Sequence, residues 1–200
     1  MKIKNIVFLV ASYPTNTSPT RSTFNREYAY ALARENIKCT VIHPIPIKGI
    51  INRNKIPYYY QDIYEKNISV DVYQPQYISL GMRKYYTHFN NMNIGLITLN
   101  NFFKASLNTI KINNIKLDAI HGFFLYPAGA AAVKIGKYLN IPSFPEIGEG
   151  SKTLKESWSV RTVGIEKAKK HFENATKFIV NSTYLKKLVV DELEYKEYNI

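Results

Sequence analysis

The 200-residue chain has little cysteine and no long hydrophobic run. Its single cysteine, Cys39, excludes an internal disulfide and any cysteine-rich metal site, and is typical of a reducing compartment. The longest purely apolar run near the start, residues 6–11, is far too short to span a bilayer, and no small-residue cleavage site follows it. These absences predict a cytoplasmic protein.

Several motifs of nucleotide and nucleophile chemistry are also missing. The sequence contains neither GxGxxG after its first apolar segment nor GxxxxGK(S/T), which argues against a nicotinamide-dependent dehydrogenase and a P-loop enzyme. It contains no GxSxG nucleophile motif. The histidines show no metal-ligand spacing; they are His43, His88, His121 and His171.

Positive charge, in contrast, is abundant. The chain carries 27 Lys and Arg against 15 Asp and Glu, a formal net charge of +12. Such a surplus favours an anionic partner: a nucleotide, a lipid head group or nucleic acid. The charges are spread along the chain without an arginine-rich tract, which makes nucleic acid the weakest of the three.

Apolar segments alternate with helical patterns along the chain. Strands are predicted at residues 4–12, 38–43, 68–73, 117–121, 141–147 and 177–180, and helices at residues 24–35, 89–110, 127–139, 166–173 and after Ser182. Ser22 or Thr23 is expected to cap the first helix, Ser182 the last, and Pro127 is expected to open the helix after the fourth strand. The alternation predicts an α/β fold, a Rossmann-like, doubly wound and mostly parallel sheet with helices on both faces. We expect one domain over residues 1–200, with residues 6–9 in a central strand.

Ligands in such sheets bind beyond the carboxyl ends of the strands, so candidate residues are sought there. His121 ends one strand, and Glu149 ends the next strand along the chain, where Gly150 gives the backbone freedom to approach a ligand. If these strands are neighbours, His121 and Glu149 face one cleft, with Arg21 on its rim. A core role for His121 and a loop-capping role for Glu149 remain open.

Four segments carry a family resemblance in the right order along the chain. They are Ser12-Tyr13-Pro14 with Arg21-Ser22-Thr23-Phe24; residues 118–129, in which His121 follows an apolar strand and Tyr126-Pro127-Ala128-Gly129 opens a helix; Ile141-Pro142 with Gly150-Ser151; and residues 178–182 with Leu185-Lys186. Together they resemble glycosyltransferase family 4 over nearly the whole chain.

The resemblance implies a GT-B architecture, in which two Rossmann-like domains face each other across a cleft. The N-terminal domain mainly holds the acceptor, and the C-terminal domain binds the nucleotide-sugar donor. Sugar transfer in this family retains the anomeric configuration and needs no metal or other cofactor. On this reading, the chain is the N-terminal half of a transferase, lacks the donor-binding domain, and is inactive alone. Its acceptor would be a glycan, a lipid-linked sugar or a surface polysaccharide.

The resemblance also implies roles for particular residues. His121 matches the first of a histidine pair, whose second position is Phe123 here, and Glu149 stands where relatives often have His or Arg. We therefore expect catalytic roles for His121 and Glu149. Binding of the acceptor or of the donor phosphates is expected from Arg21, Ser22, Tyr126, Gly150 and Ser151.

Other interpretations stay open at this point. A nucleotide-sugar epimerase can share the two-domain plan and needs several acid–base groups in its cleft, whereas a basic nucleic-acid-binding module needs a contiguous positive face. Two aromatic clusters could be surface packing on helices; they are Tyr58-Tyr59-Tyr60 and Arg83-Lys84-Tyr85-Tyr86. The second of them could instead contact the inner face of an anionic membrane.

Overall fold

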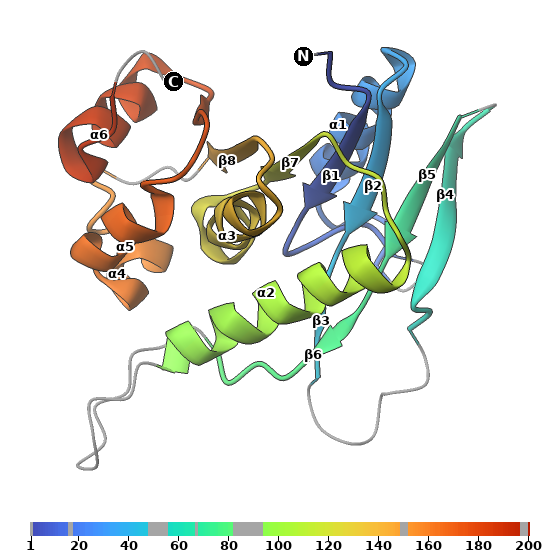
Figure 1. Ribbon diagram of the computed structural model, residues 1–200, viewed down its shortest axis with the longest axis horizontal. Coiled ribbons are helices and arrows are strands. Elements are labelled where there is room, and N and C mark those ends of the chain that lie inside the picture. Colours follow the sequence, from blue (N-terminus) through green and yellow to red (C-terminus); the bar gives the residue numbers. More distant parts are fainter. Residues whose placement is uncertain are drawn as a thin grey trace.

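The computed structural model describes residues 2–15, 18–47, 56–66, 68–81, 94–148, 152–196 and 200. A seven-stranded sheet in the order β4-β5-β2-β1-β7-β8-β9 forms its centre (Figure 1). Neighbouring strands are parallel except β4 and β5, which are antiparallel. The strands are β1 (Asn5–Leu9), β2 (Lys38–Ile42), β4 (Tyr59–Glu65), β5 (Ile68–Tyr73), β7 (Ala119–Gly122), β8 (Ser143–Ile147) and β9 (Ile179–Val180).

Strand β1 lies in the middle of this sheet, as predicted for residues 6–9. Its side chains Val7, Phe8 and Leu9 are fully buried, because helices cover both faces and an apolar run therefore suits the strand. From β1 the chain passes to β2 and β5 on one side, and later to β7, β8 and β9 on the other. The strand order thus reverses between β1 and β7, which is where open α/β sheets collect their ligands.

Helices occupy both faces of the sheet. Helix α1 (Thr23–Arg34) packs through Ala29 and Tyr30 against Phe8 of β1. Helices α2 (Ile94–Ile112) and α3 (Ala130–Leu139) cover the other face, and Figure 1 shows α2 running across the front of the molecule. Helices α4 (Trp158–Val163), α5 (Ile165–Phe172) and α6 (Thr183–Leu193) form a further cluster beyond α3. The predicted fold class is confirmed.

The edge strand β4 was not predicted. Tyr59 and Tyr60 lie in this strand, which corrects the interpretation of the tyrosine run as surface packing on a helix. The strand forms because Asp62 turns inward to Tyr13 and Arg26, with Tyr13 Oη 3.0 Å and Arg26 Nε 2.8 Å from Asp62 Oδ2. These bonds fasten β4 to α1 and to the loop after β1. The cluster at residues 83–86 lies outside the described residues.

Two predicted helix starts also differ from the structure. Ser22 precedes α1 but has φ 54°, and its Oγ donates to Ser12 Oγ at 2.9 Å instead of capping the helix. Pro127 follows a cis peptide bond within a π-helical turn, η1 (Leu125–Gly129), so α3 begins only at Ala130. Ser182 does cap α6, because its Oγ accepts from the Leu185 N–H at 3.2 Å. Strands β3 (Ile45–Pro46) and β6 (Gln76–Tyr77) form a separate short parallel pair.

Candidate functional site

His121 stands near the carboxyl end of β7, beside the point where the strand order reverses. Its register partner on β1 is Phe8, so its ring lies on the face of the sheet that α1 covers. The next residue must be glycine, because a Cβ at Gly122 would lie 2.6 Å from the Ala128 carbonyl oxygen. The chain therefore folds back tightly after β7, and His121 is held close to this turn.

The closest polar neighbour of His121 is Glu146 on β8. The register pairs His121 with Phe144, and Glu146, two residues further on, points to the same face. His121 Nε2 lies 2.9 Å from Glu146 Oε2, and the two side chains are only 3% and 14% exposed. Neither ring nitrogen of His121 has an aligned hydrogen bond within the described part of the chain. The pair is thus buried and in contact, and it keeps unused hydrogen-bonding capacity for a further group.

Aromatic rings surround this pair. The rings of Phe8 and Tyr28 have centroids 5.0 and 4.9 Å from that of His121. Burial, and after it the charge of Glu146, raise the pKa of Tyr28 to about 12, so its phenol stays neutral and can donate a hydrogen bond. Phe123 stands at the second position of the histidine pair described above. Its ring centroid lies 5.3 Å from that of the half-exposed Phe24. Sequence reasoning missed Glu146 and Tyr28; the contact of Glu146 with His121 depends on the register of β7 and β8, which no local pattern specifies.

Arg21 and Ser22 lie in the loop after β1, at the same edge of the sheet. Arg21 is exposed. Its charge is the second cause, after burial, that lowers the pKa of His43, the residue directly after β2, to about 4. His43 Nδ1 lies 3.2 Å from Gln74 Nε2. Arg21 therefore has the exposure and the position that an anion-binding residue at this edge requires.

Of the remaining predicted residues, the structure describes only Tyr126. Tyr126 is buried, its hydroxyl lies 2.8 Å from His171 Nδ1 on α5, and its ring packs against Phe172. Its polar end thus contacts the helices rather than the His121–Glu146 pair. Glu149, Gly150 and Ser151 lie outside the described residues.

A concave region lies between α2, α3 and α5, on the face of the sheet opposite α1. It encloses about 440 Å³ and combines apolar side chains with three lysines and His171. In the described part of the chain, no group of three or more His, Cys, Asp or Glu side chains could hold a metal ion. None of the described helices is long and apolar enough to cross a membrane.

Comparisons with known proteins give information on the fold alone. No protein-family model and no curated protein sequence matches the chain. Solved structures do match. A Listeria monocytogenes protein described as a UDP-N-acetylglucosamine 2-epimerase has a TM-score of 0.56 at 11% identity over 100% of this chain and 45% of its own.

Two further structures extend the comparison. The UDP-GlcNAc 2-epimerase of Methanocaldococcus jannaschii has a TM-score of 0.52 at 13% identity over 98% of this chain and 44% of its own. A UDP-glucosyltransferase from Polygonum tinctorium has a TM-score of 0.51 at 10% identity over 98% of this chain and 50% of its own. The chain is therefore similar in fold to one half of GT-B proteins and spans half or less of their length.

Proposed function

We propose that this chain is the acceptor-side, N-terminal domain of a family 4 type glycosyltransferase. The whole protein moves a sugar from a nucleotide-sugar donor to a glycan, a lipid-linked sugar or a surface polysaccharide, with retention of configuration. The observation that carries this proposal is the buried His121–Glu146 pair beside the point of strand reversal. The similarity to half of a GT-B protein supports it.

In this proposal the pair handles the acceptor. An acceptor hydroxyl loses its proton as its oxygen bonds to the sugar, and the imidazole of His121 can take that proton. Glu146 orients the ring, and the neutral Tyr28 phenol supplies a donor beside it. Glu149 is a further acid–base candidate, with Gly150 and Ser151 after it in the loop.

The donor side of the reaction needs positive charge near the leaving phosphates. Arg21 and Ser22 precede α1 at the edge of the sheet where His121 lies, so they can contact a phosphate without any metal. Most donor contacts belong to the second domain, outside this chain. With a lipid-linked acceptor, the protein would work in the cytoplasm at the inner face of the membrane.

The two-domain arrangement predicts how the 200-residue chain behaves alone. Residues 1–200 should transfer no sugar and should bind nucleotide sugars weakly or not at all, because closing two domains over the reactants supplies on the order of 7–11 kcal/mol of alignment in favourable cases. Calorimetry with nucleotide sugars checks the binding, and mass spectrometry of acceptor products checks the transfer. Micromolar donor affinity of this chain would show that the nucleotide site lies in this half.

A nucleotide-sugar epimerase is the second candidate, because two of the similar structures carry that description. An epimerase inverts a carbon of the sugar and so breaks and remakes a bond to hydrogen. In heavy water it introduces deuterium at that carbon, whereas a transferase leaves the sugar carbons unlabelled and lengthens the acceptor. Mass spectrometry of the nucleotide sugar and of the acceptor, after incubation with the complete protein, therefore separates the two functions.

A further inference from the structure

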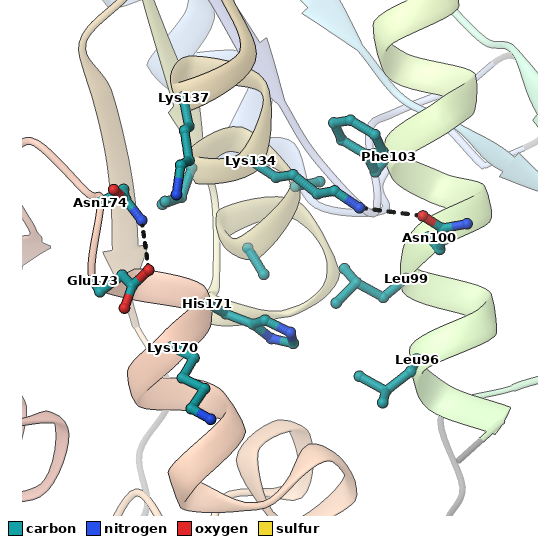
Figure 2. Close-up of a pocket in the computed structure, with 13 residues that line it drawn as sticks. Leu96, Leu99, Asn100, Phe103, Lys134, Lys137, Lys170, His171, Glu173 and Asn174 are labelled. Atoms are coloured by element: carbon teal, nitrogen blue, oxygen red, sulfur yellow. Dashed lines mark hydrogen bonds between the residues drawn. The ribbon is translucent and has the colours of Figure 1, made fainter. Parts of the chain in front are cut away.

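The cavity between α2, α3 and α5 is separate from the His121–Glu146 pair and is not used by the proposed reaction. Figure 2 shows that α3 carries Lys134 and Lys137, that α5 carries Lys170 and His171, and that α2 provides the opposite wall. A volume of about 440 Å³ lies within the usual range of small-molecule sites.

Positive charge dominates the polar part of this cavity. Lys134, Lys137 and Lys170 stand against one carboxylate, Glu173, so three positive charges and one negative leave a surplus of two. No carboxylate in the described ranges forms an ion pair with any of these three lysines. Lys134 Nζ instead donates to Asn100 Oδ1 at 3.2 Å and lies 4.2 Å from the centroid of the Phe103 ring. The lysines are therefore available to an anion.

His171 is held in place at the other side of the cavity. The Tyr126 hydroxyl lies 2.8 Å from His171 Nδ1, and Figure 2 shows the ring directed toward the α2 wall. Burial, and after it the charges of Lys134 and Lys167, lower the pKa of His171. The ring is consequently neutral at neutral pH, and the positive charge of the cavity comes from the lysines.

The remaining wall is apolar. Leu96, Leu99 and Phe103 of α2 line one side of the cavity (Figure 2), and Ala130 and Val133 of α3 also line it. A bare inorganic anion would leave this surface in contact with water, whereas an apolar substituent on the anion would cover it. The lining thus combines lysine side chains with apolar side chains, which is complementary to an amphiphile.

We propose that the cavity between α2, α3 and α5 binds an amphiphilic phosphate monoester. The phosphate dianion binds the ammonium group of Lys134, while Lys137 and Lys170 add positive potential around the cavity. The apolar substituent packs on Leu96, Leu99 and Phe103. This inference does not depend on the glycosyltransferase proposal, because it uses only the lining of this cavity.

Titration calorimetry with the 200-residue chain and hexyl phosphate, at low ionic strength, tests this site. Hexyl phosphate should bind at one site per chain, and inorganic phosphate should bind about tenfold more weakly, because the hexyl chain covers apolar surface. Lys134→Gln should weaken hexyl phosphate binding by about tenfold, the effect of losing one charged partner. Lys104→Gln is the matched control: it removes the same charge from an exposed position of α2 outside the cavity, and should leave the affinity unchanged.

Four results would overturn the site. The first is an absence of hexyl phosphate binding, and the second is equal affinity for hexyl phosphate and inorganic phosphate. Equal losses in Lys134→Gln and Lys104→Gln would show attraction to the overall charge rather than to this cavity. Retention on phosphatidic acid vesicles without any binding of hexyl phosphate would likewise assign the lysines to a flat surface contact.

Discussion

His43 and His121 are both buried at the carboxyl edge of one sheet, yet their surroundings differ. His43 follows β2, lies 3.2 Å from the Gln74 amide, and has the cation Arg21 nearby. His121 ends β7, lies 2.9 Å from the Glu146 carboxylate, and has no aligned hydrogen bond among the described residues. A buried histidine with a neutral hydrogen-bonding partner serves the fold, whereas one in contact with a carboxylate and with spare hydrogen-bonding capacity is suited to chemistry. Substituting both residues in the same way tests this distinction.

The largest expected effect concerns His43 and stability. Its pKa falls from 6.5 to about 4 on folding, so the folded protein binds fewer protons than the unfolded chain and acid favours unfolding. Its contribution to the free energy of unfolding is complete above pH 6.5. That contribution, up to about 3 kcal/mol, is lost as the pH falls toward 4. Denaturant unfolding at a series of pH values should show this loss in the wild type, and His43→Gln should reduce it by that amount. The same pH dependence of stability in both proteins would show that His43 does not cause the acid-induced loss.

The next largest effect concerns His121 and turnover. In the complete protein, His121→Gln should lower kcat by about 10²-fold, the low end for a positioned acid–base group. His43→Gln is the matched control and should leave kcat unchanged at neutral pH. If the two substitutions lower kcat equally, the distinction between the two histidines is wrong.

Glu146 should have a smaller effect, because it acts through His121. Glu146→Gln keeps the shape of the side chain and removes the charge, so we expect kcat to fall by about tenfold, less than the roughly 10²-fold expected on losing the acid–base group itself. The acceptor KM should change little, since the carboxylate need not contact the acceptor. Steady-state kinetics over a series of acceptor concentrations separate the two constants, and a change in KM alone would assign Glu146 to acceptor binding.

Substituting Arg21, which lies at the same edge of the sheet as the two histidines, should give the smallest effect. Its charge lowers the pKa of His43, so Arg21→Gln should raise that pKa and reduce the acid-induced loss of stability. The pH series used for His43 measures this difference. Arg161→Gln, an exposed change on α4, should leave the pH dependence as in the wild type, and an equal effect in both variants would indicate overall charge instead.

Much of the fold followed from the sequence because burial leaves a clear pattern. The apolar run of β1 and the alternation of strands and helices gave the sheet and its central strand. Strand β4 was missed because Asp62 and its exposed neighbours show no apolar alternation; what holds this strand is its contact with Arg26 and Tyr13, distant in sequence.

The site was predicted less completely than the fold. His121 was located by its place at a strand end, whereas its contact with Glu146 was not predicted. Glu149, which was expected to face the same cleft, lies outside the described residues, and its role stays a prediction. The contact depends on the register of β7 and β8, which pairs His121 with Phe144, and no local pattern specifies that register. The contact between the Tyr126 hydroxyl and His171 on α5 was not predicted either, because it joins residues distant in sequence; the expected role of Tyr126 in substrate binding stays a prediction.

A double-mutant cycle in the complete protein tests the central claim, that His121 and Glu146 act as one chemical unit. We predict that His121→Gln with Glu146→Gln lowers kcat no further than His121→Gln alone, since a positioning carboxylate has no effect once its imidazole is gone. If the two losses multiply instead, to about 10³-fold, the residues act independently and the account of this site is wrong.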